Sequence, residues 1–258
     1  MTKKQYLITL MLLSPSTWLY ADTLKGDFSL SSGATYTSGE YGGTETTDML
    51  YIPVTLKYTQ DKWKLKLTVP YIKIKGPQNV IRNIGQVSQT VTTTRVTNEG
   101  LGDINLSATY RVFYSQQSKT LLDVTAKVKF GTADEDKNLG TGANDFSIAV
   151  GAYKLLGDLT PYATFGRKIY GDASNIELDD VFFGSLGLSY KLSQKTSVGA
   201  NLYLKQKTAS SRVSTRQASA YSSYKLNSEW KLQTYLIAGL SDNTPDFGGG
   251  FSLAYQFD

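Results

Sequence analysis

The residue types that most often carry catalysis or bind metals are missing from this chain or stand in unsuitable positions. The sequence has no histidine and no cysteine, so it offers neither the imidazole base of a Ser-His triad nor a thiolate metal site. The adjacent carboxylates Asp179 and Asp180 would point to opposite faces of a strand. We therefore expect no enzyme and no cofactor.

The spacing of four oxygen-bearing residues is similar to that of a calcium-binding loop; they are Asp134, Asp136, Asn138 and Asp145. Leu139 occupies the position that needs glycine, and no glutamate closes the loop. The expectation is a solvated loop and no metal site. The glycine-rich stretches 100–102 and 248–250 precede no helix, so they indicate bent strand starts rather than nucleotide loops.

The elements that must position the remaining polar residues are strands, and the clearest hairpin covers residues 48–71. Even positions from 50 to 58 are apolar or aromatic, and after a turn at 59–62 the odd positions from 63 to 71 are apolar. Successive side chains of a strand point to opposite faces. Such a hairpin fits a soluble sandwich, or a membrane barrel whose apolar face meets lipid while its lysines face a wet lumen.

Alternation of this kind recurs through the chain, and no helical spacing interrupts it. Past the N-terminus no apolar run approaches the roughly 20 residues of a membrane helix, so a membrane protein of this sequence must be a closed barrel. We predict about twelve strands, at 27–37, 47–58, 63–74, 101–114, 119–131, 144–155, 158–170, 180–192, 196–207, 215–226, 229–240 and 247–257.

Loop length alternates along the chain, which distinguishes the two folds. The short links are 59–62, 115–118, 156–157, 193–195 and 227–228, and between them stand the mostly longer links 38–46, 75–100, 132–143, 171–179, 208–214 and 241–246. Outer-membrane barrels have short periplasmic turns and longer extracellular loops. The sequence therefore predicts an all-β, single closed antiparallel up-and-down barrel, with both termini on the periplasmic side.

Polar residues of the parity opposite to the apolar face are the candidates for lining a solute path through the lumen. They are Lys57, Lys64, Lys66, Asp103, Asn105, Arg111, Asp123, Lys127, Lys129, Asp145, Lys191, Asn201 and Lys205. A basic lumen would concentrate anionic solutes such as carboxylates. Alternatively, some lysines extend into the periplasm and the others pair with the three aspartates. We favour this alternative, because side chains fill much of a twelve-strand bore.

Aromatic residues cluster beside the expected short turns, where the membrane interface would lie. This candidate girdle comprises Tyr58, Trp63, Tyr110, Tyr114, Tyr190, Tyr224, Trp230 and Tyr255. A second group stands toward the long loops. The longest link, 75–100, is expected to extend its flanking strands beyond the membrane; folding inward as a constriction is the alternative.

Residues 1–21 have the pattern of a cleaved secretory signal peptide, which leaves 22–258 as the barrel. Lys3 and Lys4 precede a short apolar core, and Ala21 is small enough for cleavage. The formal net charge of +5 is spread along the strands, so we expect no nucleic-acid partner.

Several short motifs occur in a fixed order along the chain: Tyr51-Ile52-Pro53-Val54, Trp63, Val69-Pro70-Tyr71, Gly100-Leu101-Gly102-Asp103-Ile104, Tyr110-Arg111 and Gly140-Thr141-Gly142-Ala143-Asn144-Asp145-Phe146. Taken together, they resemble an outer-membrane transporter family, MetA-pathway of phenol degradation. The resemblance implies a bacterial outer-membrane barrel, often encoded near aromatic-compound catabolism. Barrels of this membrane commonly end on an aromatic that the assembly machinery reads; here Phe257 is penultimate.

The functional expectation is a passive outer-membrane channel for small organic solutes, with aromatic or carboxylate compounds as candidates. Its expected partners are outer-membrane lipid, the barrel assembly machinery and the solute; the oligomeric state is left open. Two alternatives remain: a non-conducting barrel that binds a ligand or partner through its loops, and a secreted soluble sandwich.

Overall fold

The computed structural model describes residues 26–41, 43–77, 94–172, 178–209 and 213–257. The predicted signal peptide, most of the 75–100 link and Asp258 lie outside these residues. Within them, no helix has the length and apolar character needed to cross a membrane.

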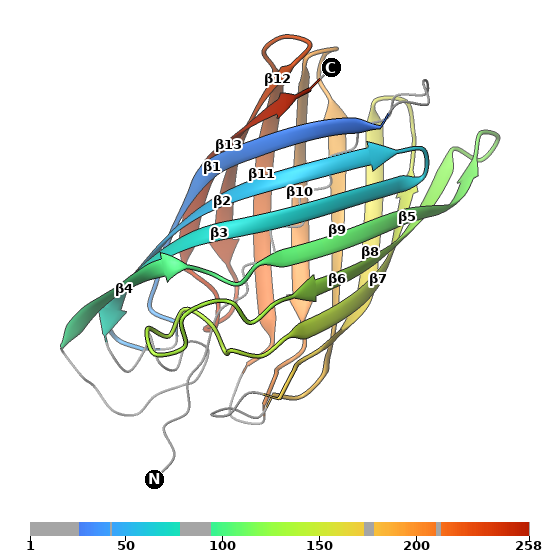
Figure 1. The fold of residues 1–258 in the computed structure, drawn as a ribbon. Helices are drawn as coiled ribbons and strands as arrows, with labels where there is room; N and C mark the ends of the chain where they lie inside the picture. Colours follow the sequence, from blue (N-terminus) through green and yellow to red (C-terminus); the bar gives the residue numbers. More distant parts are fainter. Residues whose placement is uncertain (1–25, 42, 78–93, 173–177, 210–212, 258) are drawn as a thin grey trace.

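One antiparallel sheet closes on itself to form the barrel, as predicted (Figure 1). Consecutive strands pair around the wall, and β1 closes the cylinder by pairing with β13 from Ser29–Gln256 to Ser38–Phe247. The strands are β1 Asp27–Gly39, β2 Thr47–Gln60, β3 Trp63–Pro77, β4 Arg95–Leu101, β5 Asn105–Ser115, β6 Thr120–Lys129, β7 Asp145–Lys154, β8 Leu159–Ile169, β9 Val181–Lys191, β10 Thr196–Lys205, β11 Thr215–Lys225, β12 Trp230–Gly239 and β13 Phe247–Gln256.

The predicted fourth strand, 101–114, is observed as β5, and the end of the 75–100 link before it forms a separate strand, β4, so the twelve-strand barrel has one additional strand. β5 pairs with the first half of β3, and β4 pairs with the second half, from Tyr71 to Pro77. Between them, the Gly102 N–H donates to the Pro70 carbonyl (2.8 Å). A Cβ atom at position 102 would lie 2.5 Å from the Ile72 Cδ1 atom, so the glycine lets Ile72 pack closely where the chain changes direction.

Short and long connections alternate around the barrel as the sequence predicts. The hairpin β2–β3 turns at Asp61, which has φ 50°, and the hairpin β7–β8 turns at Gly157, which has φ 65°. Positive φ at such turns matches the right-handed twist of the flanking strands. The β3 to β4 extension likewise follows the expectation that 75–100 prolongs its flanking strands, insofar as the described residues reach.

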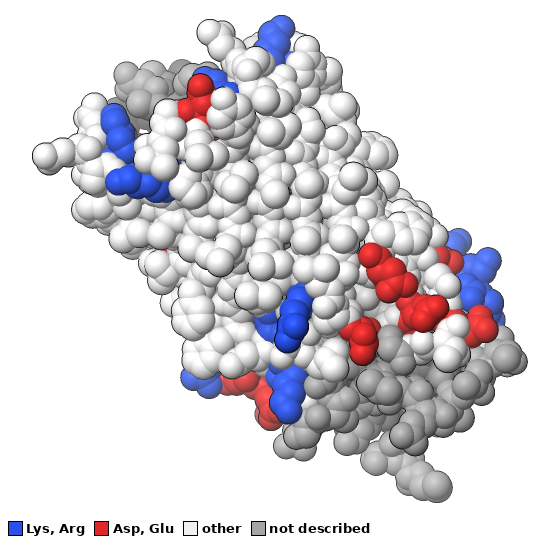
Figure 2. Space-filling view, turned by 180° about the vertical axis from the view of Figure 1, so that it is seen from behind, with Lys and Arg blue, Asp and Glu red and all other residues white. Residues whose placement is uncertain are grey.

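The outer face of the barrel is apolar, as a surface in contact with lipid must be. Leu236 on β12 is 69% exposed and Phe165 on β8 is 64% exposed, and a water-soluble protein would rarely leave so many large apolar side chains uncovered. Figure 2 shows charged side chains gathered toward the two ends of one face, with a broad band between them that carries almost none.

Aromatic side chains of neighbouring strands pair near the short turns. The rings of Trp63 and Tyr110 lie 4.7 Å apart, and those of Trp230 and Tyr255 lie 4.9 Å apart. Tyr114, Tyr190 and Tyr224 are exposed on the same outer surface, while Tyr58 packs on Phe28 at 4.6 Å. Amphipathic rings at this height suit the membrane interface.

Candidate functional site

Of the predicted lumen residues, eleven lie on the inner face of the wall and two lie at its ends. Along each strand they alternate with the lipid-exposed apolar side chains, so they point away from the membrane. Asp103 lies in the break between β4 and β5, and Lys191 stands exposed at the periplasmic end of β9. The remaining members are Lys57, Lys64, Lys66, Asn105, Arg111, Asp123, Lys127, Lys129, Asp145, Asn201 and Lys205.

Four of the inner charges form one buried network near the extracellular end. The Lys129 Nζ lies 2.7 Å from an oxygen of Asp103 and 3.5 Å from one of Asp145. Asp145 also binds Lys168 at 2.9 Å. All four side chains are at most 5% exposed, so each charge depends on its partners to replace the water it has lost.

This network holds the segment 130–144, here called the inner loop, against the wall. Asp103 accepts a hydrogen bond from the Ala133 N–H (3.0 Å), and Lys129 donates to the Thr141 hydroxyl (3.2 Å). A side chain at Gly140 would lie 2.6 Å from the Cβ of Ala133. The stretches 100–104 and 140–146, which carry the family resemblance, therefore meet in space.

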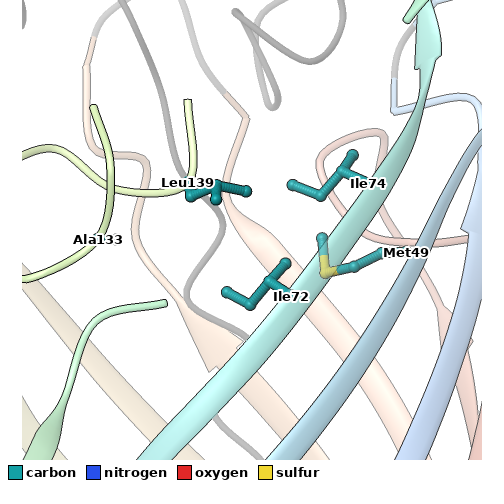
Figure 3. Close-up of a cluster of buried hydrophobic side chains, with 5 residues drawn as sticks. All are labelled: Met49, Ile72, Ile74, Ala133 and Leu139. Carbon is teal, nitrogen blue, oxygen red and sulfur yellow. The ribbon is translucent and has the colours of Figure 1, made fainter. Parts of the chain in front are cut away.

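An apolar cluster fixes the tip of the inner loop inside the barrel (Figure 3). Leu139 is completely buried and packs against Met49 of β2 and against Ile72 and Ile74 of β3. These three residues lie on the inner face of their strands. The inner loop therefore fills part of the lumen at its extracellular end.

The sequence suggested, as an alternative, that the 75–100 link folds inward; residues 78–93 of this link lie outside the described part. The inward fold of the inner loop was not predicted. The one available signal was Leu139, a large apolar residue in the middle of a loop between two inward charges, Lys129 and Asp145; the only other large apolar residue there is Phe130, directly after β6.

Three other candidate carboxylates each have a basic partner of their own. Asp123 lies 3.5 Å from Arg111 on the inner wall, Asp134 lies 3.7 Å from Lys137, and Asp180 lies 2.9 Å from Arg167. Among the residues that the structure describes, no group of three or more carboxylates, histidines or cysteines is arranged to hold a metal ion.

Tyrosines line the inner wall on the other side of the barrel, a feature that was not predicted. The ring of Tyr162 on β8 lies over Gly187 of β9, where a Cβ atom would come within 2.3 Å of it. Tyr221 covers Gly199 of β10 in the same way. The hydroxyl of Tyr162 donates to the Asn201 side chain (3.2 Å). The glycines let these rings lie flat, which keeps them out of the lumen.

A closed barrel with an apolar exterior and a polar, charged interior defines the class of outer-membrane channels. A family model described as putative MetA-pathway of phenol degradation matches residues 21–257, and the chain belongs to this family. The sequence resemblance to that family is thereby confirmed. No curated protein matches the chain significantly.

Solved outer-membrane channels share the fold. The crystal structure of an outer membrane channel from Pseudomonas putida F1 has 15% sequence identity and a TM-score of 0.75, and the match covers 95% of this chain and 100% of that one. The KdgM porin has 12% identity and a TM-score of 0.56, with 89% and 99% covered. The NanC porin has 11% identity and a TM-score of 0.56, with the same coverage.

Proposed function

We propose that this protein is a passive channel that admits small organic solutes, with aromatic and carboxylate compounds as candidates, across the bacterial outer membrane. The observation that carries this proposal is the inner wall, which presents both lysines and tyrosines within a closed barrel. Cationic ammonium groups attract carboxylates, and flat aromatic faces favour the stacking of planar rings.

The proposal extends to how the chain reaches its membrane. Residues 1–21 direct export and are removed, the barrel assembly machinery inserts the remainder, and the chain has no catalytic role. The absence of histidine from the whole sequence supports the last point, because a hydrolase of the Ser-His type needs an imidazole.

Conductance in planar lipid bilayers tests the channel directly. Purified, folded protein is expected to produce discrete current steps, and liposomes that contain it should swell in isosmotic benzoate or glycerol. Resistance to unfolding in detergent shows that a preparation is folded. A folded preparation that gives neither current nor swelling would contradict the proposal.

The inner loop favours a second candidate, a barrel that binds a partner without conducting. A segment pinned inside the lumen by buried ion pairs narrows the opening, and such segments are often functional. This candidate predicts no current from the intact protein. Deletion of 133–142 would then open a conducting path, whereas a channel would already conduct before the deletion.

A further inference from the structure

The strand register aligns four inner lysines in a single continuous row. Lys57 of β2 stands opposite Lys66 of β3, which stands opposite Ser107 of β5. Ser107 pairs with Lys127 of β6. The row then passes through Ser147 of β7 to Lys168 of β8.

This row, here called the lysine row, runs obliquely to the barrel axis, so its members lie at different depths between the periplasmic and extracellular ends. It crosses five inter-strand steps, which at about 4.8 Å each make roughly 24 Å along the wall. A barrel strand is tilted by about 40°, so the row rises by about 15 Å. Lys57 lies near the short turn after Gln60, and Lys168 stands one residue before the extracellular end of β8.

The extracellular part of the row borders a small hollow in the inner wall, and the side chains around this hollow carry an excess of positive charge. Lys127, Lys129 and Lys168 line this hollow together with Asp145. Asp145 and the nearby Asp103 balance Lys129 and Lys168 through the buried network. In the described part of the chain no carboxylate lies within ion-pair distance of Lys127, so its charge is available to a solute.

Toward the periplasmic end of the row, two lysines stand so close that their charges repel each other. A wall with only a structural role would gain nothing from this arrangement. Lys57 and Lys66 are directly opposite each other on adjacent strands, and like charges in that position destabilise a sheet. Lys66 is accessible from the lumen, and the described residues place no carboxylate within ion-pair distance of it. Serines separate Lys66 from Lys127 and Lys127 from Lys168. Their small side chains leave room beside Lys66 and Lys127 and offer hydroxyl hydrogen-bond donors.

We propose that the lysine row is a stepwise path for organic anions, and that small carboxylates are the solute class of this channel; this rests on the proposed channel function. A carboxylate bound at Lys127 passes to Lys66 and then to Lys57, because the flexible four-carbon stems let successive ammonium groups approach one solute. Several weak sites in sequence allow a solute both to enter and to leave.

Reversal potentials measured under a salt gradient give the anion-to-cation permeability ratio of the full protein, and this ratio tests the lysine row. The wild-type channel is expected to prefer chloride over potassium. Lys66→Gln and Lys127→Gln should each lower the anion-to-cation permeability ratio by about fourfold, the effect of one charge roughly 5 Å away in water. Lys195→Gln, in the exposed turn between β9 and β10, removes the same charge outside the lumen and should leave the ratio unchanged.

Lys127→Arg keeps the charge and should keep the selectivity, which separates a loss of charge from a loss of structure. Heat-modifiable migration in detergent gels shows that each variant is folded. Equal ratios in wild type, Lys66→Gln and Lys127→Gln would overturn the lysine row while leaving the channel function intact. No current from any variant would overturn the channel function itself, and the inference with it.

Replacing chloride by butyrate on one side tests the solute class. We expect a butyrate-to-chloride permeability ratio above the ratio of their mobilities in free solution, and a return toward that ratio in the double variant Lys66→Gln/Lys127→Gln. A wild-type ratio at or below the free-solution value would overturn the assignment to carboxylates.

Discussion

Replacing Asp103 by asparagine should release the inner loop from the wall. The change keeps the size of the side chain but removes one of four buried charges, and it leaves Lys129, Asp145 and Lys168 with a net positive charge. Lys129 then loses its 2.7 Å partner and keeps only the 3.5 Å contact with Asp145. Removing one member of a buried ion pair costs about 3–5 kcal/mol.

That cost translates into a large change in how often the loop opens. Every 1.4 kcal/mol is a factor of ten, so the open population should rise between about 100-fold and a few thousand-fold. The side chain of Lys137, in the middle of the inner loop, is 58% exposed, and it offers trypsin a cleavage point once the loop is free. Cleavage of the transiently open form follows its population.

Limited proteolysis of the folded barrel, with fragments identified by mass spectrometry, measures this opening. Asp158→Asn in the exposed β7–β8 turn is the matched control, and it should be cleaved at the wild-type rate. The double variant Asp103→Asn/Lys129→Gln should recover part of the protection, because it also removes the stranded ammonium group while the pair Asp145–Lys168 remains. Cleavage of Asp103→Asn at the wild-type rate would refute the idea that this network anchors the loop.

Two further predictions concern the two faces of the wall. Leu236→Arg on the outer face should destabilise the barrel in lipid vesicles by about 2–4 kcal/mol, whereas Gln233→Arg on the inner face of the same strand should have little effect. Urea unfolding measures both variants, and equal unfolding midpoints would argue against hydrocarbon around Leu236. Gly187→Val should push the Tyr162 ring away from the wall and lower the single-channel conductance, at a cost of about 1–3 kcal/mol in stability. Gly249→Ala on the outer face is its control, and a Gly187→Val channel of unchanged conductance would show that the ring does not border the pore.

Local patterns along the chain were sufficient to predict the barrel. Period-two alternation is a property of each strand by itself, because neighbouring side chains must point to opposite faces. Loop lengths are likewise read directly from the spacing of the strands. The hairpin at 48–71 therefore indicated both its turn and its two faces, and the order of loop lengths distinguished a membrane barrel from a sandwich.

The break between β4 and β5 was not predicted, although the glycines at 100 and 102 marked the place. The sequence suggested a bend at a strand start there. The change of pairing along β3 depends on where Gly102 meets Pro70 and Ile72, and that contact joins segments about thirty residues apart in the chain.

Alternation by itself determined which residues share a face, and so it assembled the lysines and aspartates as candidates. Which lysine stands beside which aspartate was decided only by the tertiary structure. Pairing across strands depends on the stagger with which the barrel closes, and a shift of one residue in register would break the lysine row. The inward fold of the inner loop depends in the same way on Leu139 finding an apolar site on β2 and β3, a long-range contact that has no periodic signal in the sequence.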